Sequence, residues 1–168
     1  MSQKKDHYPF TIRKATEKDV KTLFTLVKEL AEYEKLLDEV KATENDFLSF
    51  GFGTPSYFNA LLVETDEGTP VGFALYFFTF STFEGRPSLY LEDIYVKPVF
   101  RGKGIGKQLL KKLVQIAIEK DCNRMEWAVL NWNTPAIEFY QSLGAFPMNE
   151  WTTYRLNRET METLKDTL

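Results

Sequence analysis

The sequence predicts a mixed α/β domain, in which a central mixed sheet is flanked by helices and residues 1–168 form a single domain. Three strand-like segments follow one another between residues 58 and 96, which is typical of an antiparallel meander. Helical and strand patterns then alternate from residue 104 onward, which is typical of parallel strands joined by crossover helices.

The first elements are a strand and two helices. Residues 10–13 read as a short strand, and apolar residues recur at helical spacing from residue 20 to about residue 34. The segments 16–19 and 43–46 each place a threonine three residues before an aspartate, the spacing of a capped helix start. We therefore expect one long and one short helix before the meander.

The meander and the crossovers occupy the rest of the chain. Strands are expected at 58–64, 70–80 and 89–96. These are followed by a helix at 104–120, a strand at 124–130, a helix at 134–143 that Gly144 ends, and a late strand at 151–156.

A glycine-rich run, RGKGIG at residues 101–106, joins the third strand of the meander to the next helix. Bare backbone N–H groups at a helix start, with lysines beside them, form a site for phosphate oxygens. A dinucleotide fingerprint starting at Gly102 would need glycine where Lys107 stands, and no Gly-Lys pair precedes the Ser or Thr of a P-loop. The pattern left is Arg-x-x-Gly-x-Gly, either a phosphate loop of another kind or a turn that binds no ligand.

Composition limits the chemistry. The single histidine, His7, and the single cysteine, Cys122, exclude Ser-His and Cys-His nucleophilic pairs, histidine-based zinc sites and an internal disulfide. We expect no metal, and proton transfer must use carboxylates, tyrosine, lysine, Cys122 or water. A net charge of −3 offers no basic surface for nucleic acid. The polar first ten residues and the lack of a long apolar run predict no signal peptide, no membrane segment and a cytoplasmic protein.

Several motifs in order resemble one family. The segments LYLEDIYV at 89–96, RGKGIG at 101–106, AVLNWN at 128–133 and the pair Phe139-Tyr140 are together similar to the diamine acetyltransferase branch of the GNAT superfamily of N-acetyltransferases. The similarity runs from about residue 12 to residue 155. It implies the GNAT acyl-CoA N-acyltransferase fold, acetyl-CoA as co-substrate, a small-molecule amine as acceptor, and a homodimer.

The resemblance also assigns two catalytic roles. Glu92 matches a family glutamate that acts as base through water, and Tyr140 matches the donor of a proton to the CoA thiolate. The plain alternatives are a strand carboxylate that faces solvent and a core aromatic beside Phe139. Asp93 points to the opposite face from Glu92 in a regular strand, whereas a bulge would change this.

Residues around these two are expected to bind the ligands. Asn133 is expected to cap the helix that follows it, and the same region contacts the pantetheine arm in the family. The residues expected to bind acetyl-CoA are Ile94, Tyr95, Val96, Arg101, Gly102, Lys103, Gly104, Ile105, Gly106, Lys107, Asn133, Thr134, Pro135, Ala136 and Tyr140. The residues expected to bind the acceptor are Tyr33, Glu34, Glu92, Asp93, Glu126, Trp127, Ala128 and Thr152.

The acceptor residues contain one departure from the family. The polyamine enzymes carry an acid near the last strand, where this chain has Thr152. The segments 34–36, 93–96 and 128–130 are closer to the thialysine-type members, so we expect a short diamine or a thialysine-like amino acid rather than spermine. The alternatives are a protein lysine or N-terminal acetyltransferase and a CoA-binding module without catalysis.

Overall fold

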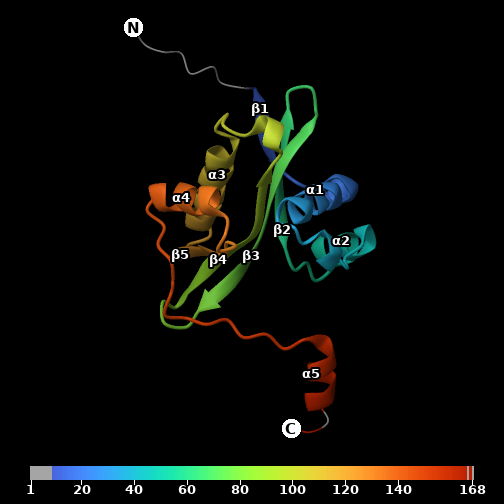
Figure 1. The fold of residues 1–168 in the computed structure, drawn as a ribbon, viewed down its shortest axis with the longest axis vertical. Helices are drawn as coiled ribbons and strands as arrows, with labels where there is room; N and C mark the ends of the chain where they lie inside the picture. The colour runs from blue at the N-terminus through green and yellow to red at the C-terminus, as the bar shows by residue number, and fades with distance from the viewer. Residues whose placement is uncertain (1–8, 166, 168) are drawn as a thin grey trace. The chain divides into compact units, whose positions relative to one another are not determined.

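The structure, a computed structural model, describes residues 9–165 and 167, and His7 lies outside the described residues. The chain divides into two compact units, Met1–Ala128 and Val129–Leu168. Figure 1 shows the sheet in the first unit and two further helices in the second. That residues 1–168 act as a single domain stays a prediction.

The first unit is built on a five-stranded sheet in the order β1-β2-β3-β4-β5. Its strands are β1 (Phe10–Lys14), β2 (Asn59–Thr65), β3 (Pro70–Ser81), β4 (Arg86–Val96) and β5 (Arg124–Trp127). Neighbours from β1 to β4 are antiparallel, and β4 pairs with β5 in parallel. The predicted mixed sheet, with its meander and crossover, is confirmed.

Three helices cover this sheet (Figure 1). Helices α1 (Val20–Tyr33) and α2 (Glu44–Gly51) lie on one face, which we call the α1 face, and α3 (Ile105–Glu119) lies on the other. The two capped starts form as expected. The backbone N–H of Thr16 donates to Asp19 at 2.8 Å, and that of Thr43 donates to Asp46 at 2.7 Å.

A buried cluster joins α1 to the middle of the sheet. Because successive strand residues alternate between faces, every second residue of β3 contributes to it. The cluster contains Ala15, Leu23, Leu26, Leu30, Ala60, Leu62, Phe73, Leu75 and Tyr95. The end of α1 and the end of β4 are therefore held together by the same apolar core.

The second unit differs from the expectation. It contains α4 (Thr134–Ser142) and α5 (Arg158–Lys165), whereas the strand expected at 151–156 was wrong: these described residues are exposed and form no sheet pairing. A strand needs a neighbour to bind its backbone groups, and sequence alternation alone does not supply one. The following helix α5 was not expected, and Asn157 caps it by accepting a bond from the Thr160 N–H at 2.9 Å.

Candidate active site

The glycine loop, residues 101–106, forms an open surface at the start of α3. Gly102 and Gly104 have φ angles of +75° and +82°, which side-chain-bearing residues rarely adopt. A Cβ added at Gly102, Gly104 or Gly106 would meet nothing within 4 Å. The space above the loop backbone is therefore free for a ligand rather than filled by the protein.

The start of α3 presents backbone donors beside this loop. Gln108 N–H donates to Gly104 carbonyl oxygen at 3.0 Å, and the N–H groups of residues 105–107 precede this first helical bond. Together with the positive end of the helix dipole they form an anion site. Lys103 and Lys107 are both exposed next to it. This arrangement fits a pyrophosphate.

Arg101 connects the glycine loop to the end of α1 and to the end of β4. Its Nε donates to the Val96 carbonyl oxygen at 2.8 Å. The guanidinium lies 4.4 Å from the ring centroid of Tyr33 and 5.7 Å from that of Tyr95. Arg101 and Tyr33, expected to bind the donor and the acceptor respectively, thus contact each other.

Strand β4 contains a bulge at Glu92. Leu75 of β3 pairs with Asp93 and the next residue, Tyr76, pairs with Leu91, so Glu92 is the extra residue of the ladder. This settles the alternation question raised by the sequence. Asp93 shares the face of its partner Leu75, which belongs to the core beneath α1.

The bulge also brings Tyr90 to the α1 face. Tyr90 pairs with Phe77, two residues after Leu75 on β3, and the two aromatic rings stack with centroids 5.2 Å apart. Tyr90 and Asp93 are three residues apart and would face opposite sides of a regular strand. With one extra residue between them, both lie on the α1 face.

Carboxylates gather around this bulge. Burial, then the charges of Glu92 and Glu34, raise the pKa of Asp93 to about 7. Burial also raises the pKa of Glu34, at the end of α1. We call Glu34, Glu92 and Asp93 the acid cluster. Because burial and two neighbouring acids raise the pKa of Asp93, a positively charged ligand would relieve the repulsion there.

Tyr90 and Arg124, which the sequence analysis did not single out, extend this surface. Burial and the charges of Glu92 and Glu126 raise the pKa of the Tyr90 phenol. Glu126 pairs with Tyr90 across the sheet, and Arg124 pairs with Ser88. The Nε of Arg124 lies 3.4 Å from Oε2 of Glu126. Period-2 spacing on a strand was the only signal that could have found them.

The end of β4 has an open edge. The last pair between β4 and β5 is Leu91 with Trp127, whereas β4 continues to Val96. Strand β5 is thus shorter than expected, because the chain turns and Asn133 N–H donates to the Leu130 carbonyl oxygen at 2.8 Å. Ala128 follows β5 and is exposed. Residues 94–96, expected to bind the donor, lie on the part of β4 that pairs with β3 on one side and is not paired with β5 on the other.

The remaining predicted residues lie in the second unit. Asn133 is buried, and its Oδ1 accepts from the Ala136 N–H at 3.4 Å, which confirms the expected cap of α4. Thr134 and Pro135 form the exposed first turn of α4, and half-buried Tyr140 lies with its ring centroid 5.5 Å from that of Phe139. Thr152 is exposed in the irregular segment.

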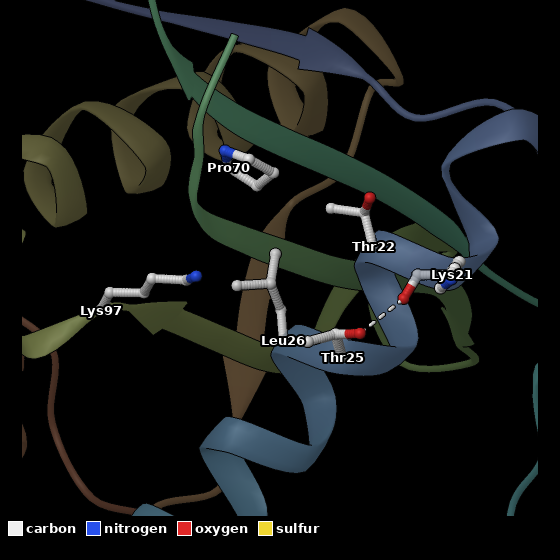
Figure 2. A pocket seen from close by; sticks show the side chains of 6 residues that line it. All are labelled: Lys21, Thr22, Thr25, Leu26, Pro70 and Lys97. Carbon is white, nitrogen blue, oxygen red and sulfur yellow. Dashed lines mark hydrogen bonds between the residues drawn. The ribbon is translucent and has the colours of Figure 1, made fainter.

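A shallow pocket of about 210 Å³ lies at the other end of α1 (Figure 2). Its lining residues are Lys21, Thr22, Thr25, Leu26, Pro70 and Lys97. Lys97 lies 3.3 Å from a carboxylate oxygen of Glu29.

Residues 9–165 and 167 lack two kinds of feature. Within these residues no group of three or more His, Cys, Asp or Glu side chains could hold a metal ion. Nor does any helix of this part of the chain combine the length and the apolar character needed to cross a membrane.

Comparison with known proteins gives the class. Residues 20–145 match the acetyltransferase (GNAT) family. The chain belongs to this family and is an N-acetyltransferase. The GNAT family uses acetyl-CoA as its co-substrate.

Individual relatives narrow the branch. The chain is 42% identical to the thialysine N-epsilon-acetyltransferase of Bos taurus, over 91% of this chain and 95% of that protein. It is 41% identical to the human spermidine/spermine N(1)-acetyltransferase-like protein 1, over 90% of this chain and 23% of that longer protein. A solved integron cassette protein from V. cholerae superposes with a TM-score of 0.78 at 28% identity, covering 93% of this chain and 97% of its own.

Proposed function

We propose that this N-acetyltransferase transfers the acetyl group of acetyl-CoA to a primary amine of a small di- or polyamine or of a thialysine-like basic amino acid. The acid cluster carries the proposal, because three carboxylates beside the end of β4 suit a cationic acceptor. The names of the bovine and human relatives support the same acceptor class.

The amine must lose a proton before it can react. An aliphatic amine has a pKa near 10.4, so freeing its lone pair at pH 7 costs about 4.6 kcal/mol. Glu34 and Asp93 hold the ammonium ion, and Glu92, which is exposed on the bulge, takes its proton through a water molecule. The acceptor also contacts Tyr33, Glu126, Trp127, Ala128 and Thr152.

The donor lies along the open edge of β4 and the glycine loop. Acetyl-CoA supplies an acetyl group activated as a thioester. The backbone N–H groups of residues 102–107 hold its pyrophosphate, with Lys103 and Lys107 nearby. Backbone N–H groups of residues 94–96 stabilise the negative charge that develops on the acetyl oxygen. Residues 133–136 contact the pantetheine arm.

Tyr140 completes the proton transfers. Its hydroxyl donates to the departing sulfur. A phenol pKa near 10 against a thiol pKa near 8.5 makes full transfer uphill by about 2 kcal/mol, so a hydrogen bond to the sulfur describes its role as well as protonation does. From the family resemblance we further propose that the enzyme is a cytoplasmic homodimer.

Thiol release from acetyl-CoA tests the proposal. The amines are putrescine, diaminopropane, spermidine, spermine, ornithine and thialysine. Glu92→Gln and Tyr140→Phe are each expected to lower turnover by about 10²–10⁴-fold. Exposed Glu39→Gln and Tyr154→Phe serve as matched controls that keep normal rates.

The outcomes separate the alternatives. Near-wild-type turnover in both variants would overturn the assigned mechanism. Acetylation of peptides but of no small amine would favour a protein acetyltransferase. Binding of acetyl-CoA with no thiol release on any acceptor would favour a module without catalysis.

A further inference from the structure

Arg124 and Glu126 form a pair of opposite charges next to the acid cluster. Arg124 Nε lies 3.4 Å from Glu126 Oε2, and the two side chains are 45% and 38% exposed. An ion pair as exposed as this contributes little to the stability of a fold. Both side chains therefore remain open to a ligand, and the fold does not depend on their contact.

The pair lies on the same face of the sheet as the acid cluster. Glu126 pairs with Tyr90, which the bulge places on the α1 face together with Asp93. Arg124 precedes Glu126 by two residues and therefore shares its face. The Tyr90 phenol lies within the electrostatic reach of both Glu92 and Glu126, so the acids form one continuous surface.

The separation fits one kind of acceptor. Tyr90 and Asp93 are three residues apart on β4, which corresponds to about 7–10 Å, and Glu126 lies one strand further across, about 5 Å away. An extended lysine-type side chain places its terminal nitrogen about 6 Å from its α-carbon. With that nitrogen at the acid cluster, the α-carbon groups come within reach of the longer side chains of Glu126 and Arg124.

We propose that Arg124 and Glu126 bind the α-carboxylate and the α-ammonium group of an amino-acid acceptor, whose side-chain amine is acetylated at the acid cluster. This inference rests on the proposed function and narrows its acceptor class. An α-amino acid carries adjacent opposite charges that match the pair, and a guanidinium binds a carboxylate through two parallel hydrogen bonds. A diamine of the same length lacks the carboxylate.

The same arginine acts against long polyamines. A polyamine bound through one terminal amine would extend a second ammonium group toward Arg124, where like charges repel. Specificity commonly combines such a repulsive element with an attractive one. Arg124 thus favours amino acids in two ways.

Matched acceptors and one variant test the proposal. Lysine is compared with cadaverine and with lysine methyl ester, and ornithine with putrescine, in the wild type and in Arg124→Gln. We expect the wild type to have the lower KM for the two amino acids. Arg124→Gln is expected to raise that KM at least tenfold, to leave kcat within twofold, and to lower the KM for diamines and for spermidine, because the repulsion of their second ammonium group is removed. Arg124→Lys is expected to restore part of the lost affinity for amino acids.

A second variant separates the two halves of the pair. 6-Aminohexanoate has the carboxylate of lysine without its α-amine. Glu126→Gln is expected to raise the KM for lysine and to leave that for 6-aminohexanoate unchanged. Arg86→Gln removes another ion-paired, 47% exposed arginine of the same sheet and should change neither value.

Failure takes two distinguishable forms. This inference is overturned if each amino acid and its diamine have equal KM values in the wild type, or if Arg124→Gln shifts both KM values equally. The proposed function still stands in that case if amine acetylation depends on Glu92. Absence of acetylation on every amine would overturn both.

Discussion

The guanidinium of Arg101 lies 4.4 Å from the ring centroid of Tyr33, which joins the glycine loop to the last residue of α1. The glycine loop, where we propose that the donor binds, and the end of α1, which Glu34 follows, are thus in direct contact. A change on one side of this contact should be felt on the other.

Tyr33→Leu tests this coupling. Without the ring beneath it, the Arg101 side chain loses a contact worth about 0.5–1 kcal/mol and samples other rotamers. We expect the KM for acetyl-CoA to rise severalfold, measured by thiol release at saturating amine. Tyr33→Phe keeps the ring and should behave as wild type; an unchanged KM in Tyr33→Leu would show that the contact has no part in donor binding.

Asp93→Asn tests the electrostatics of the acid cluster. The folded pKa of Asp93, about 7, exceeds the unfolded value, so the unfolded state releases this proton first as the pH rises. The free energy of unfolding of the wild type should therefore fall relative to that of Asp93→Asn between about pH 4 and pH 7 by up to about 4 kcal/mol. Urea unfolding at pH 4.5 and pH 8 measures this difference. A pH-independent difference would contradict the raised pKa that burial and the charges of Glu92 and Glu34 give Asp93.

Gly106→Ala separates folding from donor binding. Gly106 lies inside α3 with open space around it, so alanine should raise the free energy of unfolding by about 0.5–1 kcal/mol. The added methyl group projects where the phosphates are proposed to lie, so the KM for acetyl-CoA should increase at the same time. Gln115→Ala, on the exposed side of α3, serves as control for a change in helix propensity alone. A more stable variant with normal KM would remove Gly106 from the donor site.

Arg13 of β1 binds two carboxylates, Asp19 just before α1 and Glu64 of β2. Its guanidinium donates to Asp19 at 2.8 Å and to Glu64 at 2.8 and 2.9 Å, and it lowers the pKa of the Asp19 carboxyl well below its usual range. We expect Arg13→Met to lower the free energy of unfolding at pH 7 by about 1–3 kcal/mol. The stability lost in Arg13→Met should be smaller at low pH. Because Arg13 lowers the pKa of Asp19, the ion pair stabilises the wild type fully above the pKa that Asp19 has in the unfolded chain. This stabilisation is lost as the pH falls and the Asp19 carboxyl is protonated. Arg158→Met, which breaks an exposed helical pair with Glu162, should cost less than about 0.5 kcal/mol.

Local signals predicted most of the fold. The caps at Thr16 and Thr43 and the glycines around α3 act within a few residues of themselves, so the sequence contains all that they require. The segment 151–156 shows the opposite case. Its alternation is local, but a strand exists only with a neighbour, and pairing depends on residues far away in the chain.

The site was predictable in composition but not in geometry. Glu92 and Asp93 stand out as adjacent acids in an apolar strand, yet their orientation depends on pairing with Leu75 and Tyr76 of another strand. Glu126 was expected to bind the acceptor from the family resemblance alone, and Arg124 read only as a polar residue of a short strand. Their relation to Tyr90 follows from the parallel register with β4, which one strand alone does not encode.

The bulge in β4 bears on how such a site can arise. Asp93 and Tyr95 already face α1, and Leu91 faces the other side, so a β4 without residue 92 would be a regular strand with the same core. The hydrogen-bond ladder makes no use of the residue that we propose as the base. A single-codon insertion into an ordinary strand is therefore enough to add that carboxylate, because the pairing on either side of residue 92 is the same with and without it.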